Sequence, residues 1–140
     1  MNRFVFLILA VFIAHPIVAH AQDSPSRFTK QHMKSIVVSL AQALNHNSVG
    51  VQASAVQAIR QLEWEFPYEP LGELLDPLMD IVKNEESDTR VRLLAVIALD
   101  GLHSDIGDKL IETIARISKN QSMKDLCNSL IVKNDKFRSE

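Results

Sequence analysis

Residues 88–102 read DTRVRLLAVIALDGL, a stretch with apolar residues in nearly every helical turn. Forty positions earlier, residues 48–62 read SVGVQASAVQAIRQL in the same pattern. Each copy starts with a helix-capping residue, has a valine three positions later, and has a small residue, Ala55 or Ala95, four positions after the valine. A small side chain lets a neighbouring helix approach closely, so we expect both alanines to be buried at helix contacts.

A third, weaker copy of this helix starts at Asn120. It has Cys127 at the small position, and Ile131 in the layer that Ile59 and Leu99 fill in the other copies. Cys127 therefore aligns with two alanines, which favours a buried packing residue over a reactive nucleophile. Periods of about 30 to 40 residues are typical of helical solenoids, in which each hairpin buries its apolar face against the next.

Apolar residues spaced three and four apart predict helices along the rest of the chain. Short loops join them, and short loops favour antiparallel hairpins. The predicted helices cover residues 28–44, 48–64, 71–84, 88–102, 104–118 and 120–133, with Ser48, Asp88, Ser104 or Asp105, and Asn120 as N-caps. The sequence therefore predicts an all-α fold of about three helical hairpins.

Residues 74–102, LLDPLMDIVKNEESDTRVRLLAVIALDGL, resemble a HEAT repeat. In that family the first helix often carries a proline, here Pro77, and the second often starts with Asp-x-x-Val-Arg, here residues 88–92. The family often stacks this Asp and Arg as a polar ladder. The resemblance covers residues 28–133. It implies a right-handed α-α superhelix, a HEAT-like solenoid, and a function in binding or scaffolding.

The first 21 residues have the pattern of a cleaved secretory signal. Arg3 gives a positive start, residues 4–14 are an uncharged apolar run, and Ala19 and Ala21 fit the small-x-small cleavage site. The apolar run is shorter than the roughly 20 residues of a membrane span, so we expect no stable span after cleavage. The predicted organisation is a signal at 1–21, a lead at 22–27, a repeat domain at 28–134 and a tail at 135–140. The protein is then secreted or periplasmic.

Composition and motifs argue against catalysis, metals and cofactors. Loss of Arg3 with the signal takes the formal net charge from −2 to −3, which does not favour nucleic acid. The single cysteine excludes an intrachain disulfide. No histidine or cysteine spacing fits a metal site, and no glycine-rich phosphate loop occurs. His103, Ser104 and Asp105 are triad residue types, but adjacent residues cannot form the required line of hydrogen bonds.

Two features of residues 63–88 leave alternatives open. Nine acidic residues occur there against one base, Lys83, and a solvated acidic face is favoured over a docking patch for a basic partner. The same region starts with EWEFPY, which holds the only tryptophan and the only tyrosine. Trp64 and Tyr68 either cover the first hairpin or form an exposed contact for a partner. Of these two interpretations, we favour packing.

Equivalent positions on the second helices form a polar row. The candidate partner-binding residues are Gln52, Arg92 and Lys124 in this row, Arg60 and Asp100 further along the same helices, and Trp64 and Tyr68. We expect an exported, non-catalytic scaffold that binds a protein or peptide with salt-sensitive affinity. The alternatives are a small ligand-handling or lyase-like HEAT-family enzyme, which rests on family analogy, and a secreted modulator that self-associates into a homo-oligomer.

Overall fold

The computed structural model describes residues 30–67 and 71–139, and this part of the chain is all-helical, as predicted. It contains six α-helices and one short 3-10 turn, η1. The elements are α1 (Lys30–Leu44), α2 (Val49–Glu65), η1 (Gly72–Leu74), α3 (Leu75–Lys83), α4 (Thr89–Gly101), α5 (Asp105–Ile117) and α6 (Gln121–Arg138). The predicted signal and lead, residues 1–27, lie outside the described residues.

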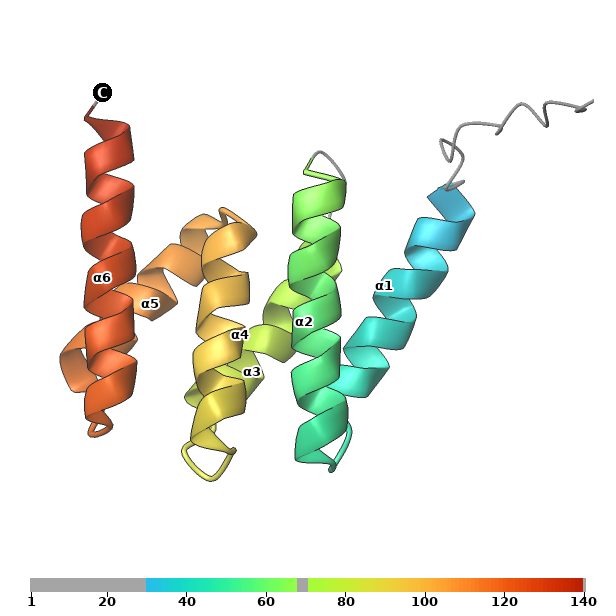
Figure 1. Ribbon diagram of the computed structural model, residues 1–140, viewed down its shortest axis with the longest axis horizontal. Coiled ribbons are helices and arrows are strands. Elements are labelled where there is room, and N and C mark those ends of the chain that lie inside the picture. Colours follow the sequence, from blue (N-terminus) through green and yellow to red (C-terminus); the bar gives the residue numbers. More distant parts are fainter. Residues whose placement is uncertain (1–29, 68–70, 140) are drawn as a thin grey trace, which may run out of the picture.

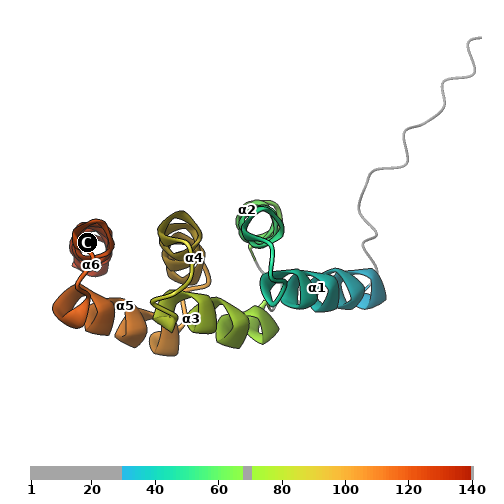
Figure 2. The ribbon, with the colours of Figure 1, turned by 90° about the horizontal axis from the view of Figure 1, so that it is seen from below.

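The helices form three hairpins in two layers. Figure 1 shows α2, α4 and α6 standing side by side, and Figure 2 shows them in one layer above α1, α3 and α5. Within each hairpin the two helices pack together, and α4 also contacts α2 on one side and α6 on the other. The middle hairpin therefore joins the first hairpin to the third.

The core lies between the two layers and follows the repeated pattern. Ala55, Ala95 and Cys127 are all buried, which confirms their predicted place in the small layer. Ile59 and Leu99 are fully buried behind them. Side chains larger than these at the small positions would collide with a neighbouring helix, because interiors are close-packed. The repeated pattern therefore places a small residue in the core at the same position of α2, α4 and α6.

All four predicted N-cap positions are confirmed, and two of the four side chains make a capping hydrogen bond. Asp88 Oδ1 accepts a hydrogen bond from the backbone N–H of Arg90 at 2.9 Å, and Asn120 Oδ1 accepts from the N–H of Met123 at 3.1 Å. Ser48 and Ser104 occupy N-cap positions, but their side chains make no capping hydrogen bond.

The third predicted helix is divided, and the sixth is longer than predicted. A 3-10 turn precedes α3, and Pro77 lies in the first turn of α3, where its missing N–H costs little. α6 continues to Arg138 instead of ending at Lys133, so most of the predicted tail is helical. Lys133 and Asn134 in this part of α6 both bind Asp100 of α4, which holds the last turns in place.

Candidate functional site

Two of the three residues in the predicted polar row make hydrogen bonds within the protein. Arg92 is buried, and its Nε and Nη2 donate to the carbonyl oxygen of Val82 at 3.1 and 2.9 Å. Gln52 Nε2 donates to the carbonyl oxygen of Leu44 at 2.9 Å. Both side chains therefore satisfy carbonyl groups at the end of the preceding helix. Arg92 is not a surface residue, which corrects its assignment as a partner contact; Lys124, the third member, is half-buried.

Asp100 is also an internal residue instead of a surface contact. It is buried and accepts hydrogen bonds from Lys133 Nζ at 2.9 Å and Asn134 Nδ2 at 2.7 Å. These bonds join α4 to α6. The acidic partner of the expected ladder, Asp88, pairs with exposed Arg90 at 3.2 Å. The charged residues of the motif thus hold helix ends and hairpins together.

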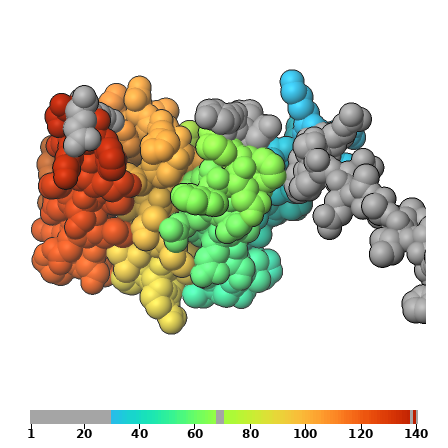
Figure 3. Space-filling view, turned by 45° about the horizontal axis from the view of Figure 1, so that its top comes forward, coloured from blue at the N-terminus to red at the C-terminus, as the bar shows by residue number. Residues whose placement is uncertain are grey.

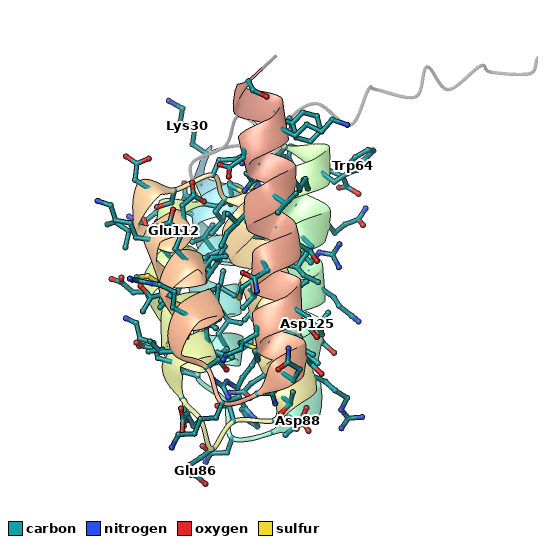
Figure 4. The ribbon with its side chains drawn as sticks, turned by 90° about the vertical axis from the view of Figure 1, so that its left-hand side faces the viewer. Lys30, Trp64, Glu86, Asp88, Glu112 and Asp125 are labelled. Atoms are coloured by element: carbon teal, nitrogen blue, oxygen red, sulfur yellow. The ribbon has the colours of Figure 1, made fainter. Side chains whose placement is uncertain are left out.

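Trp64 is exposed, which makes the favoured packing interpretation wrong for this residue. Its exposed fraction is 85%, because α2 continues through position 64 and carries it on the solvent side. The neighbouring Phe66 is the aromatic that packs against the core. Tyr68 lies outside the described residues. Figure 4 shows Trp64 and Glu112 on opposite sides of the molecule.

We call the solvent side of the α2–α4–α6 layer the outer face. On α2, a shallow depression on this face is lined by Gln57, Arg60, Gln61 and Trp64. On α4, the partly exposed positions include Leu94 and Ile97, while most other positions are buried. Figure 3 shows α2 (green) open on the surface. The outer face therefore combines a large aromatic, aliphatic side chains and long polar side chains.

A second feature is a cavity of about 330 Å³ where α2, η1 and α4 meet. Its apolar lining comes from Phe66, Pro67, Leu71, Leu75 and Leu102. Among the described residues, the polar side chains on its wall are those of Glu63 and His103, and Gly72 and Gly101 also line it. Its size is at the lower end of the range for small-molecule pockets.

Glu63 has an unusual environment for a carboxylate. Its Oε1 is buried and has no hydrogen-bond partner among the described residues. Burial raises the pKa of Glu63 from 4.5 to about 7; Arg60 opposes the rise and Asp100 adds to it. Buried polar groups are nearly always paired, so an unpaired oxygen calls for a specific reason.

Gly101 makes room for this carboxylate. A side chain at position 101 would start within contact distance of the Glu63 carboxyl group, so any larger residue there displaces it. Two positions further on, His103 has a φ of 48°, in the left-handed region. This conformation ends α4 beside the cavity, in the manner of a C-terminal cap.

Glu63 was predicted to belong to the solvated acidic face, and the cavity was not predicted. The position of Glu63 on α2 was the sequence feature that indicated its burial. Buried Ala55, Val56 and Ile59 mark the core side of this helix, and Glu63 is one turn beyond Ile59 on that side. A carboxylate that continues an apolar stripe is the feature that periodicity alone could have found.

Cys127 and the metal-ligating residue types were the remaining candidates for chemistry among the described residues. Burial raises the pKa of the Cys127 thiol to about 11, which keeps it protonated and unreactive near neutral pH. In residues 30–67 and 71–139, no three His, Cys, Asp or Glu side chains gather as metal ligands would. Among the same residues, no helix has the length and apolar character needed to cross a bilayer.

Comparison with known proteins gives no match: no family model, no curated protein and no solved structure is significantly similar to this chain.

Proposed function

We propose that the chain is an exported, non-catalytic HEAT-like solenoid of three hairpins that binds a protein partner on its outer face. The observation that carries this proposal is the 85% exposure of Trp64 on the outer face. Exposing a tryptophan in water is unfavourable, and tryptophans are enriched among the residues that dominate protein interfaces. The Ala19–Ala21 cleavage pattern supports export.

The composition of the outer face supports a protein partner. Leu94 and Ile97 of α4 supply aliphatic surface, and Gln57, Arg60 and Gln61 supply a polar margin next to Trp64. Non-obligate interfaces combine apolar and polar contacts in this way. Arg60 remains available there, because its side chain is exposed.

The first test is to isolate a partner from secreted or envelope proteins with the mature chain as bait, and then to measure affinity by calorimetry. We expect Trp64→Ala to weaken binding at least about tenfold, as the loss of a central aromatic contact does. Ile117→Ala is the matched control, because Ile117 is 68% exposed at the end of α5 in the opposite layer. Equal affinities of wild type and Trp64→Ala would place the partner elsewhere.

A second candidate function is self-association through α6. Val132 and Phe137 are each 69% exposed on this end helix, and a stack of hairpins leaves the apolar side of its last helix without a neighbour. Light scattering on the purified mature chain tests this candidate. A mass that doubles with concentration in the wild type, and not in Phe137→Ser, supports it; a monomer at all concentrations rules it out.

A further inference from the structure

The cavity between α2, η1 and α4 is the strongest unassigned feature of the structure. Apolar side chains form part of its walls, and Glu63, the one acidic side chain among its described lining residues, has an oxygen without a hydrogen-bond partner among the described residues. Ionising this carboxylate in such surroundings is costly unless a donor or a positive charge is supplied. Because Oε1 itself is buried, a ligand in the cavity offsets this cost by placing a positive charge beside the Glu63 carboxyl group.

The helix ends around the cavity favour a positive charge over a neutral donor. The last turns of both α2 and α4 border it, and neither last turn contains a basic residue. The C-terminal end of a helix carries partial negative charge. The start of η1 and α3 also borders the cavity, but Glu73 and Asp76 offset its positive end. Together, the helix ends and acidic side chains make this corner of the cavity, beside Glu63, negative, and apolar side chains border it.

Among the described residues, Arg60 offsets the negative charge of this corner only in part, because its charge lowers the pKa of Glu63 without preventing the net rise. Arg60 lies one turn before Glu63 on α2, yet no ion pair joins the two side chains within the described residues. Asp100 of α4 adds negative charge, but it is already held by Lys133 and Asn134 of α6. His103 is the other titratable group on the cavity wall.

We propose that this cavity binds an alkylammonium group, with its –NH₃⁺ donating to the Glu63 carboxylate and its methylene chain lying against Phe66 and Leu75. An ammonium is a compact charge with three donors, which suits a corner with one carboxylate and nearby helix carbonyls. A guanidinium has five donors and needs more acceptors than this wall provides. The proposal is independent of a partner on the outer face.

The test is an NMR titration of the folded mature chain with n-butylammonium chloride at pH 8, following the backbone amides of residues 101–103. We expect a dissociation constant of about 1–10 mM, which is reasonable for so small a ligand. The neutral analogue n-butanol should bind at least about tenfold more weakly, because it lacks the charge. Equal binding of the two compounds overturns the proposal.

Matched variants assign the binding to Glu63. Glu63→Gln keeps the shape of the side chain and removes its charge, so it should weaken n-butylammonium binding at least about tenfold. Glu65→Gln changes an exposed acid two residues away and should bind as the wild type does. Circular dichroism confirms that each variant is folded. Tight binding by Glu63→Gln would contradict the assignment.

The pH dependence gives an independent readout. With a pKa of about 7, Glu63 is ionised to about one tenth at pH 6 and about nine tenths at pH 8, while an alkylammonium stays charged throughout. Affinity should therefore rise about tenfold between these pH values. His103→Asn, which retains a residue suited to the left-handed region, should preserve the rise. Loss of the rise in this variant would move the site to the imidazole.

Alkylammonium groups occur both in free amines and in lysine side chains, and a second probe separates these sources. Binding of Nα-acetyl-lysine methylamide as strong as that of n-butylammonium assigns the cavity to a lysine of a protein. Binding of n-butylammonium alone assigns it to a free amine. Both outcomes retain the alkylammonium site, whereas failure of both probes overturns it.

Discussion

Glu63→Gln should change the pH dependence of stability in a defined direction. The pKa of Glu63 is 4.5 in an unstructured chain and about 7 in the folded protein. Between these values the folded protein binds the proton more strongly than the unfolded chain does. The free energy of unfolding contributed by this group is therefore fully present below about pH 4.5 and falls as the pH rises to about 7.

The magnitude follows from the size of the shift. The full shift corresponds to about 3 kcal/mol, and solvent screening of this half-buried group reduces the expected effect to about 1–2 kcal/mol. Relative to the wild type, Glu63→Gln should thus gain about 1–2 kcal/mol in unfolding free energy between pH 4.5 and pH 8. Contributions that do not depend on pH, such as packing of the new amide, cancel in this difference.

Urea denaturation followed by circular dichroism at the two pH values measures this effect. Glu65→Gln, a change at an exposed acid on the same helix end, should show no difference from the wild type at either pH. If Glu63→Gln and the wild type differ by the same amount at pH 4.5 and pH 8, the Glu63 carboxylate is not destabilised by burial. The cavity would then lack the feature on which the ammonium site depends.

Three further predictions concern the stack and the N-terminus. Ala95→Leu should lower the unfolding free energy by about 1–3 kcal/mol through overpacking, while Ser54→Leu on the exposed side of α2 should not, as thermal unfolding can show. Arg92→Leu should cost about 1–3 kcal/mol in urea denaturation, because the carbonyl that it caps loses its partner; Arg90→Leu at the exposed pair should leave stability unchanged. Mass spectrometry of the native protein should find a chain that starts at or near Gln22, and an intact leader would contradict export.

Periodicity was enough to predict the helices and the buried small layer. The 40-residue offset placed Ala55 and Ala95 correctly in the core, because a small residue at the same position of each helix allows close helix packing. The helix ends were predicted less well. α6 extends past Lys133 through hydrogen bonds to Asp100, which lies 33 residues away in the sequence. Such long-range contacts leave no local signal.

The roles of individual side chains also depended on contacts that the local sequence does not indicate. A long polar residue on a repeated helix face, such as Arg92, has the same pattern whether it binds a partner or turns back to cap its own hairpin. The structure distinguishes the two, because its guanidinium reaches Val82. The Glu63 cavity depends on Gly101 and on the ends of two helices, which meet only after the hairpins have packed.

The most direct test of a partner on the outer face is photo-crosslinking in the cell that exports the protein. A benzophenone amino acid in place of Trp64 reports the outer face, and the same group in place of Glu112 reports the opposite layer (Figure 4). We predict one dominant protein adduct from position 64 and no such adduct from position 112. The same adducts at equal yield from both positions, or adducts from position 112 alone, would contradict a binding site on the outer face.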